Sequence, residues 1–195
     1  RFGSISSIRK NQLEFAKNPT ALDWVKEILI SKFSNQSTLL LYFVAMDKYN
    51  EDDIHKYIKN IEKYITKTKE LKADTLEEAA QTLRGWEGSS SRWYFECISK
   101  YLPDAYQFEK RSQHPANDMF NCLLNYAYGM LYNAVEGSLL KAGLDPFIGI
   151  YHKDEYNKPV LTYDFIEVFR VWADFTVIYL CQQEVIFKEF FDVEK

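Results

Sequence analysis

Cysteine is scarce in this sequence, and the few cysteines lie far apart. Among the 195 residues there are 3 Cys, at positions 97, 122 and 181, and no two of them form a Cys-x-x-Cys pair. This spacing argues against a disulfide framework and against a zinc site built from cysteine pairs. It is typical of a protein from a reducing cytosol, so we expect a cytoplasmic location.

Long apolar runs and excess positive charge are also missing. No apolar run reaches the roughly 18 residues that a membrane-spanning helix needs, and no signal peptide is present. The formal net charge is −4, which gives no sign of a broad basic surface for nucleic acid. A DNA partner would have to be bound locally, with the help of a metal ion or of a segment outside this sequence. Because the sequence begins without Met, we interpret it as a piece of a longer polypeptide.

Several catalytic motifs are absent, which narrows the possible chemistry. The sequence has no Walker loop, no Gly-x-Gly-x-x-Gly, no Gly-x-Ser-x-Gly elbow and no Glu-x-x-His pair of the kind used by di-iron bundles. What remains is a site made mostly of carboxylates with one imidazole. Such a donor set suits Mg²⁺ or Mn²⁺ better than Zn²⁺.

What the sequence does contain is an almost continuous helical pattern with enough apolar residues for a real core. Hydrophobic residues make up 47% of the chain and aromatic residues 16%. Apolar residues at i, i+3, i+4 and i+7 predict an all-α fold. We expect helices over residues 4–16, 20–33, 36–49 (a continuation or a new helix) and 52–71, and then a helix that begins after Asp74 and carries Glu87. Two more are expected over residues 117–143, with Gly143 as the C-terminal cap, and 161–191 as one last helix after Pro159. Asp74 and Glu77 resemble a capping box at the start of the helix that carries Glu87, and residues 103–115 form a linker.

Glu87 stands out because it lies between Gly85 and Gly88 and is followed by three serines, inside a predicted helix. A glycine in a helix interior costs about 1 kcal/mol relative to alanine. Two glycines around one carboxylate therefore indicate that something large must approach the backbone there. Glu136 is a competitor, because it too is followed by Gly and Ser and interrupts an apolar face, and the residue pattern does not choose between the two.

Of the 3 His, only His152 has a functional context. His55 lies in a Lys-rich amphipathic helix and His114 in the polar linker, so we expect both at the surface. His152 follows an apolar stretch and precedes a helix that carries Asp164 and Glu167 on one face. A histidine near two carboxylates is either a metal ligand or an ion-pair partner, and spacing leaves both open.

Four segments together resemble a known family. They are residues 1–12, 83–95, 108–152 and 161–170, which include "LRGWEGSSSRWYF", "GLDPFIGIYH" and "LTYDFIEVFR". In order and spacing they are similar to the CRISPR-associated integrase that installs new spacers, CRISPR-associated protein one, over essentially the whole chain. The resemblance implies that residues 1–195 are the family's single helical catalytic domain, without its N-terminal β-domain, and that residues 1–18 are the junction to that missing domain.

The resemblance also implies a site. Glu87, His152 and Glu167 match the family's ligands for one divalent ion, Mg²⁺ or Mn²⁺, and the family's third ligand is either Asp or Glu. Asp164 would support these ligands or replace one of them. Tyr132 matches a tyrosine near the reacting DNA end. Glu136 falls at a family position outside the metal triad.

The implied reaction is attack of the 3′-hydroxyl of a short foreign DNA on a phosphodiester of the CRISPR repeat, with cleavage of branched DNA at the same site. The implied partners are DNA, a second copy in a homodimer and the small companion adaptation protein. A non-catalytic helical scaffold and a transposon-encoded integrase of the same fold are the alternatives. Candidate phosphate contacts are Arg84, Arg92, Lys110, Arg111 and Arg170.

Overall fold

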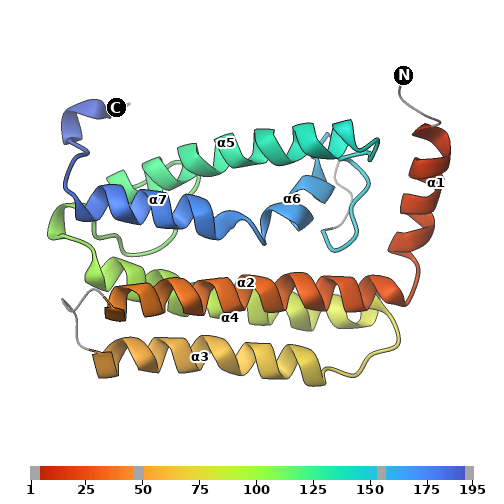
Figure 1. The fold of residues 1–195 in the computed structure, drawn as a ribbon, viewed down its shortest axis with the longest axis horizontal. Helices are drawn as coiled ribbons and strands as arrows, with labels where there is room; N and C mark the ends of the chain where they lie inside the picture. The colour runs from red at the N-terminus through yellow and green to blue at the C-terminus, as the bar shows by residue number, and fades with distance from the viewer. Residues whose placement is uncertain (1–4, 46–50, 153–156, 192–195) are drawn as a thin grey trace.

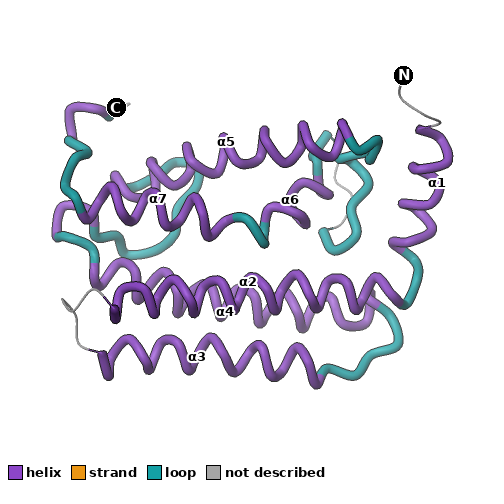
Figure 2. The backbone as a smooth tube through the Cα atoms, viewed as in Figure 1, coloured by secondary structure: helices purple, strands orange, loops and turns teal. Residues whose placement is uncertain are grey.

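The fold is entirely helical over the part of the chain that the structure describes. The computed structural model describes residues 5–45, 51–152 and 157–191, and no strand occurs in these ranges, which confirms the predicted all-α class (Figure 2). No helix in the described ranges is long and apolar enough to span a membrane. The α-helices are α1 (Ile5–Ala16), α2 (Thr20–Ala45), α3 (Glu51–Glu70), α4 (Leu76–Tyr101), α5 (Met119–Lys141), α6 (Val160–Ile166) and α7 (Arg170–Gln182), with short 3₁₀ turns at Asp104–Tyr106 and Lys188–Phe190.

The long helices form two layers around one main apolar core. In Figure 1, α2, α3 and α4 run alongside one another, α5 and α7 lie over them with α6, and α1 stands at one end. Helix α3 shows why this layer forms. Its apolar residues recur at helical spacing: Ile54, Tyr57, Ile58, Ile61 and Tyr64 are buried against the core and Ile65 is half-buried, whereas most of its lysines are exposed. The 26-residue α2 is continuous through the position where the sequence left a break open.

The start of α4 differs from the predicted capping box by one residue. Thr75, and not Asp74, is the N-cap, and its side chain accepts a hydrogen bond from the backbone N–H of Glu78. The Glu78 carboxylate accepts in return from the backbone N–H of Asp74, 3.1 Å away. The box is therefore Thr75 and Glu78, and the shift leaves the position of Glu87 in α4 unchanged.

The prediction of one continuous last helix is wrong, because the helix is interrupted after Ile166. Helix α6 ends there, α7 begins at Arg170, and Glu167 lies at the break. No glycine or proline marks the break. The side-chain amide of Asn35, on α2, donates a 3.1 Å hydrogen bond to the carbonyl of Val168, so the break is stabilised by a distant helix.

The loop between α5 and α6 is shaped by two glycines and by α1. Gly143 follows the last turn of α5 with a φ of +82°, which confirms it as the C-terminal cap. At Gly149, a built Cβ would collide with the carbonyl oxygen of His152, so only glycine fits. Gln12 of α1 donates to the carbonyls of Asp145 and Ile148, each at 2.8 Å. These contacts fix the path of the chain leading to His152.

Candidate active site

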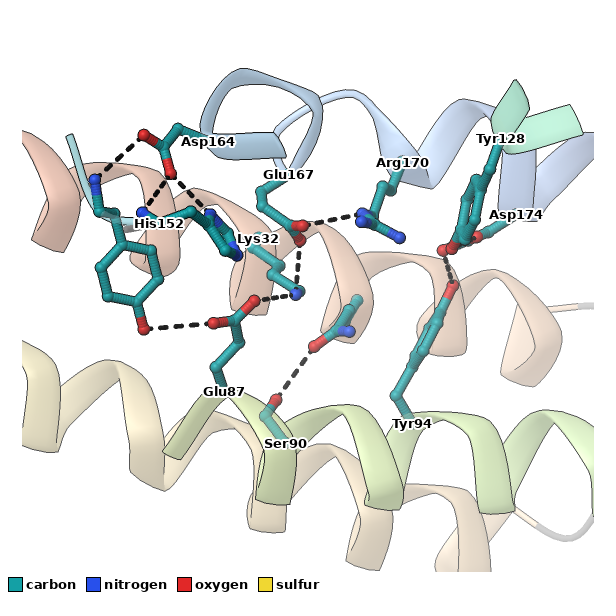
Figure 3. A network of polar contacts seen from close by, with 12 residues as sticks. Lys32, Glu87, Ser90, Tyr94, Tyr128, His152, Asp164, Glu167, Arg170 and Asp174 are labelled. Atoms are coloured by element: carbon teal, nitrogen blue, oxygen red, sulfur yellow. Dashed lines mark hydrogen bonds and ion pairs between the residues drawn. The ribbon is translucent and has the colours of Figure 1, made fainter. Parts of the chain in front are cut away.

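Helices α2 and α4, the end of α6 and the loop that carries His152 meet at one cluster of charged side chains (Figure 3). The ammonium of Lys32, on α2, lies 2.6 Å from Glu87 Oε1, on α4, and 2.5 Å from Glu167 Oε2, at the end of α6. All three side chains are largely buried, with 10%, 15% and 4% of their surface exposed. Two carboxylates that are 80 residues apart in the chain therefore share one positive charge in a region of low water access.

Glu167 carries a second cation on its other oxygen. Arg170 Nε lies 2.9 Å from Glu167 Oε1. Burial raises the pKa of Glu167, but the positive charges of Lys32 and Arg170 outweigh burial and hold it below its ordinary value. Glu167 Oε2 is in ion-pair contact with Lys32. Each oxygen of this buried carboxylate therefore faces one cation.

His152 is held by Asp164, which turns away from the shared cation. Asp164 accepts hydrogen bonds from the backbone N–H groups of Ile150, Tyr151 and His152, at 2.8, 3.0 and 2.9 Å. Its Oδ1 also lies 2.7 Å from His152 Nδ1. Because Nδ1 is engaged with Asp164, Nε2 is the ring nitrogen left for another partner. Burial lowers the pKa of His152, but the contact with Asp164 and the charges of Glu87 and Glu167 raise it above its ordinary value.

Tyr151 connects the histidine loop to α4. Its hydroxyl donates a 3.2 Å hydrogen bond to Glu87 Oε2, while Glu87 Oε1 faces Lys32. Burial, followed by the Glu87 charge, raises the pKa of Tyr151 well above its ordinary value, so the hydroxyl stays a donor at neutral pH. Both oxygens of Glu87 are thereby oriented.

Glu87, Glu167 and His152 are the types of side chain that bind a hard divalent ion, but they lie too far apart to coordinate one in this structure. In the described ranges, no group of three His, Cys, Asp or Glu side chains is close enough to form a finished metal site. Figure 3 nevertheless shows Glu87, Glu167 and His152 directed toward the region of the Lys32 ammonium. Two carboxylates that already flank one cation, and an imidazole oriented by a carboxylate, are donors that Mg²⁺ or Mn²⁺ would accept. The types of donor therefore suit such an ion, and the Lys32 ammonium occupies the position between the two carboxylates.

The glycines beside Glu87 face open space. A Cβ added at Gly85 or Gly88 would meet no atom within 4 Å, and both residues are exposed. No neighbouring segment of the described chain therefore requires their small size. Ser89 bonds back to the carbonyl of Gly85, and Ser90 reaches inward to Gln36 on α2, 3.0 Å away. The turn of α4 that carries Glu87 is anchored on its inner side and bare on its outer side.

A groove of about 810 Å³ opens beside His152. Tyr132, on α5, lines it, and its hydroxyl accepts a 2.8 Å hydrogen bond from Arg170. Arg111, His114, Lys158 and Tyr163 also contribute to the walls. The groove thus combines cationic groups with tyrosine rings and leads to the charged cluster.

The five predicted phosphate contacts differ in their exposure and in the contacts that they already make within the protein. Arg84, Arg92 and Lys110 are exposed. Arg111 is bound to Asn121 and Asn125 and lies over the ring of Tyr128, which makes it a clamp between the linker and α5. Arg170 is engaged with Glu167 and Tyr132.

Glu136 lies on α5 and makes none of the contacts of the charged cluster. His55 and His114 are both exposed, as the sequence predicts.

A second buried polar cluster lies beside the first (Figure 3). The two oxygens of Asp174, on α7, accept hydrogen bonds from the hydroxyls of Tyr94 and Tyr128, at 2.8 and 2.6 Å. Burial raises the pKa of Asp174 to about 6, although both tyrosine hydrogen bonds lower it. Arg170 lies over the ring of Tyr128, 4.6 Å from its centre, and joins the two clusters.

Two participants were missed by reasoning from the sequence, Lys32 and Tyr151. Lys32 has a visible signal, because Leu29, Phe33 and Gln36 place it on the buried face of α2. A lysine on a buried helix face requires a partner. Tyr151 adjoins His152 in an apolar stretch and carries no comparable signal.

The chain matches known proteins along nearly all of its length. The model of the family described as "CRISPR associated protein Cas1" matches residues 3–195. A protein of Leptospira interrogans named CRISPR-associated endonuclease Cas1 is 32% identical over 187 residues, covering 93% of this chain and 67% of that protein. CRISPR-associated endonuclease Cas1 3 of Thermus thermophilus is 40% identical over 113 residues, which cover 57% of this chain and only 34% of that protein.

The fold agrees with these sequence matches. A chain of the solved "Cas6-RT-Cas1--Cas2 complex" superposes with a TM-score of 0.82 at 28% identity, covering 93% of this chain and 19% of that one. The chain described here spans a small share of that assembly's polypeptide. Both the family match and the shared helical architecture lead to the same assignment: the chain belongs to the CRISPR-associated protein Cas1 family.

Proposed function

We propose that this chain carries the active site of a metal-dependent DNA integrase and endonuclease that inserts foreign DNA into a CRISPR array. The observation that supports this most directly is the arrangement of Glu87 and Glu167. Two carboxylates from separate helices flank one cation, with His152 oriented toward them. In this proposal Glu87, His152 and Glu167 hold one Mg²⁺ or Mn²⁺. The ion would stabilise the charge that develops on the phosphate in the transition state.

Each neighbouring residue has a defined task in this proposal. Asp164 is a positioning residue and not a ligand, because its oxygens are occupied by three backbone N–H groups and the His152 ring. Arg170 orients Glu167 and Tyr132 together. The bare glycine face of α4 leaves room for a DNA backbone to approach the turn that carries Glu87.

The reaction is a transesterification at phosphorus. The 3′-hydroxyl oxygen of the incoming DNA forms a bond to a phosphorus of the repeat, and the bond from that phosphorus to the 3′-oxygen of the repeat strand breaks. The proton of the attacking hydroxyl is lost and the leaving oxygen gains one, so no oxidant or covalent enzyme intermediate is needed. Reversal of these steps would release the inserted strand, and water in place of the 3′-hydroxyl would give cleavage.

The partners follow from the family and from the shape of the site. We propose DNA as the substrate, a homodimer, and the companion protein Cas2, with which the structural neighbour is named in a complex. Residues 1–195 would form the catalytic domain, with residues 1–18 joining it to further parts of the protein, in the cytoplasm. Arg84, Arg92 and Lys110 are exposed for DNA phosphates, whereas Arg111 and Arg170 would act from inside the groove.

The test uses Glu87→Ala and His152→Ala in the full-length protein with Mn²⁺ and a branched DNA. We expect each to reduce strand transfer roughly 100-fold or more, the scale of losing a group that stabilises transition-state charge. Glu136→Ala, the carboxylate on α5 outside the cluster, is the control and should retain activity. Undiminished strand transfer by Glu87→Ala or His152→Ala would overturn the site and favour a helical scaffold.

A further inference from the structure

The ammonium of Lys32 has an unusual position for a lysine. It is buried at the centre of the charged cluster, 2.6 Å from one carboxylate and 2.5 Å from another. Lysine is almost never buried without partners, because its ammonium is strongly hydrated in water. These two carboxylates are the same groups that the proposed function assigns to a divalent ion.

We infer that Lys32 is an internal stand-in for the divalent ion: it holds Glu87 and Glu167 together in the metal-free protein and must leave this position when the ion binds. This inference rests on the proposed function. It assigns a positioning and affinity-setting role to a residue that contacts neither DNA nor the proposed ion in the bound state.

The contacts explain why a cation is needed there. Without one, two buried carboxylates would face each other at short range, and repulsion between like charges in a region of low dielectric is costly. The Lys32 ammonium lies within 2.6 Å of one oxygen of each carboxylate, so it competes with a metal ion for the same oxygens.

The structure also provides room for the ammonium to withdraw. A cavity of about 50 Å³ adjoins Lys32 and is lined by Gln36, Tyr128, Arg170 and Asp174, among others. Roughly 10–15 Å³ of such space holds one water molecule, so the cavity can accept a group of ammonium size. The side chains of Asp174 and Gln36 line it, and their oxygens, which already accept from Tyr94, Tyr128 and Ser90, would each have to accept one further hydrogen bond. A rotation of the lysine side chain, without movement of α2, would then vacate the space between the carboxylates.

The experiment measures Mn²⁺ binding by the full-length protein with isothermal titration calorimetry, and the melting temperature with and without Mn²⁺. Lys32→Met removes the charge and keeps an unbranched side chain of similar length. We expect it to bind Mn²⁺ tenfold or more tightly than the wild type. Its melting temperature should fall in the metal-free form and rise more than that of the wild type when Mn²⁺ is added.

Two further variants keep the inference testable if Lys32→Met does not fold. Lys32→Arg retains the charge and adds a planar fork that can pair with both carboxylates, so we expect Mn²⁺ binding to weaken. Lys26→Met, on the same helix, makes the same change in net charge away from the cluster and should bind Mn²⁺ like the wild type. Its ammonium contacts only the carbonyls of Lys69 and Leu71 in the described structure.

The outcomes separate this inference from the proposed function. If the wild type binds Mn²⁺, Glu87→Gln abolishes binding, and Lys32→Met binds no more tightly, the metal site stands and the role of Lys32 is wrong. Equal or tighter binding by Lys32→Arg would also contradict it. If the wild type binds no Mn²⁺, the proposed function and this inference both fail.

Discussion

The two buried polar clusters of this chain lie next to each other but are built on opposite principles. The cluster around Lys32 consists of full charges, with two carboxylates sharing one ammonium and Glu167 paired with Arg170 as well. The cluster around Asp174 has one carboxylate whose two oxygens each accept a tyrosine hydroxyl. Under the proposed function, the first set of contacts would exchange the ammonium for a metal ion, whereas in the second each carboxylate oxygen already has a donor.

This difference indicates which cluster serves chemistry and which serves the fold. A buried ion pair contributes little net stability, because desolvation offsets most of its attraction, but removing one partner leaves a costly unpaired charge. A satisfied hydrogen-bond network is a structural feature that orders the side chains around it. Arg170 touches both clusters, so the Asp174 cluster supports Glu167, at the end of α6, through α7.

The largest effect is expected at Asp164, which holds the backbone and the ring of His152 beside the charged cluster. Asp164→Ala leaves three backbone N–H groups of the histidine loop without their acceptor. Each unsatisfied donor costs about 1–3 kcal/mol, so the free energy of unfolding should fall by about 3 kcal/mol or more. Strand transfer should fall roughly 10–100-fold, as for loss of a group that orients a ligand. Urea titration and a strand-transfer assay measure the two effects, and an unchanged stability would contradict the assigned contacts.

The next effect concerns pH and the structural cluster. The pKa of Asp174 is raised to about 6 from an ordinary value of 3.8, so the native state holds this proton more tightly than the unfolded state. Its contribution to stability is therefore present at about pH 4 and is lost as the pH rises through about 6. Relative to Asp174→Asn, the wild type should lose about 3 kcal/mol of unfolding free energy between pH 3 and pH 8. A difference that stays constant over this range would contradict the shifted pKa, and Asp23→Asn, at an exposed site on α2, is the control.

A smaller effect separates the two clusters directly. Tyr128→Phe removes one hydroxyl from Asp174 and keeps the ring beneath Arg170. Loss of a hydrogen bond to a charged group should reduce the free energy of unfolding by about 2 kcal/mol. Mn²⁺ affinity should stay within about twofold, because no proposed ligand is touched. Tyr126→Phe, at an exposed tyrosine on the same helix, is the matched control for denaturation. A large change in Mn²⁺ affinity would show that the clusters act as one unit.

The smallest effect is expected outside both clusters, at the exposed Arg92 of α4. Arg92→Ala should weaken DNA binding less than tenfold and reduce the salt dependence by at most about one counterion. Fluorescence anisotropy at several salt concentrations measures both quantities. A much larger loss of DNA affinity would indicate that Arg92 contacts the substrate in the active site and is not merely a surface contact.

The elements that could be predicted from the sequence are those whose signals are local. Helix α3 follows its apolar stripe, and Gly143 ends α5 as its backbone requires. The break after Ile166 could not be predicted, because its stabilising group, Asn35, is on another helix. The shift of the α4 cap from Asp74 to Thr75 lies within the uncertainty of such boundaries.

The candidate site shows the same division. Glu87 is marked by its glycines, and His152 by its place after an apolar stretch, and the structure brings both toward Glu167. Their role as metal ligands stays a prediction. The position of Lys32 depends on three helices meeting, so the sequence showed only that a lysine lies on a buried face.

A single amide side chain carries a consequence for how this protein can be handled. Gln12 of α1 donates to two carbonyls of the loop before His152 and accepts a 3.0 Å hydrogen bond from the backbone N–H of Asp145. The first helix therefore holds the loop that leads to His152, although the two are far apart in the chain. Any shortened version made for crystallisation or screening has to keep α1. Deleting α1 would remove the Gln12 hydrogen bonds and loosen the loop before His152, even though the deletion is far from His152 in the sequence.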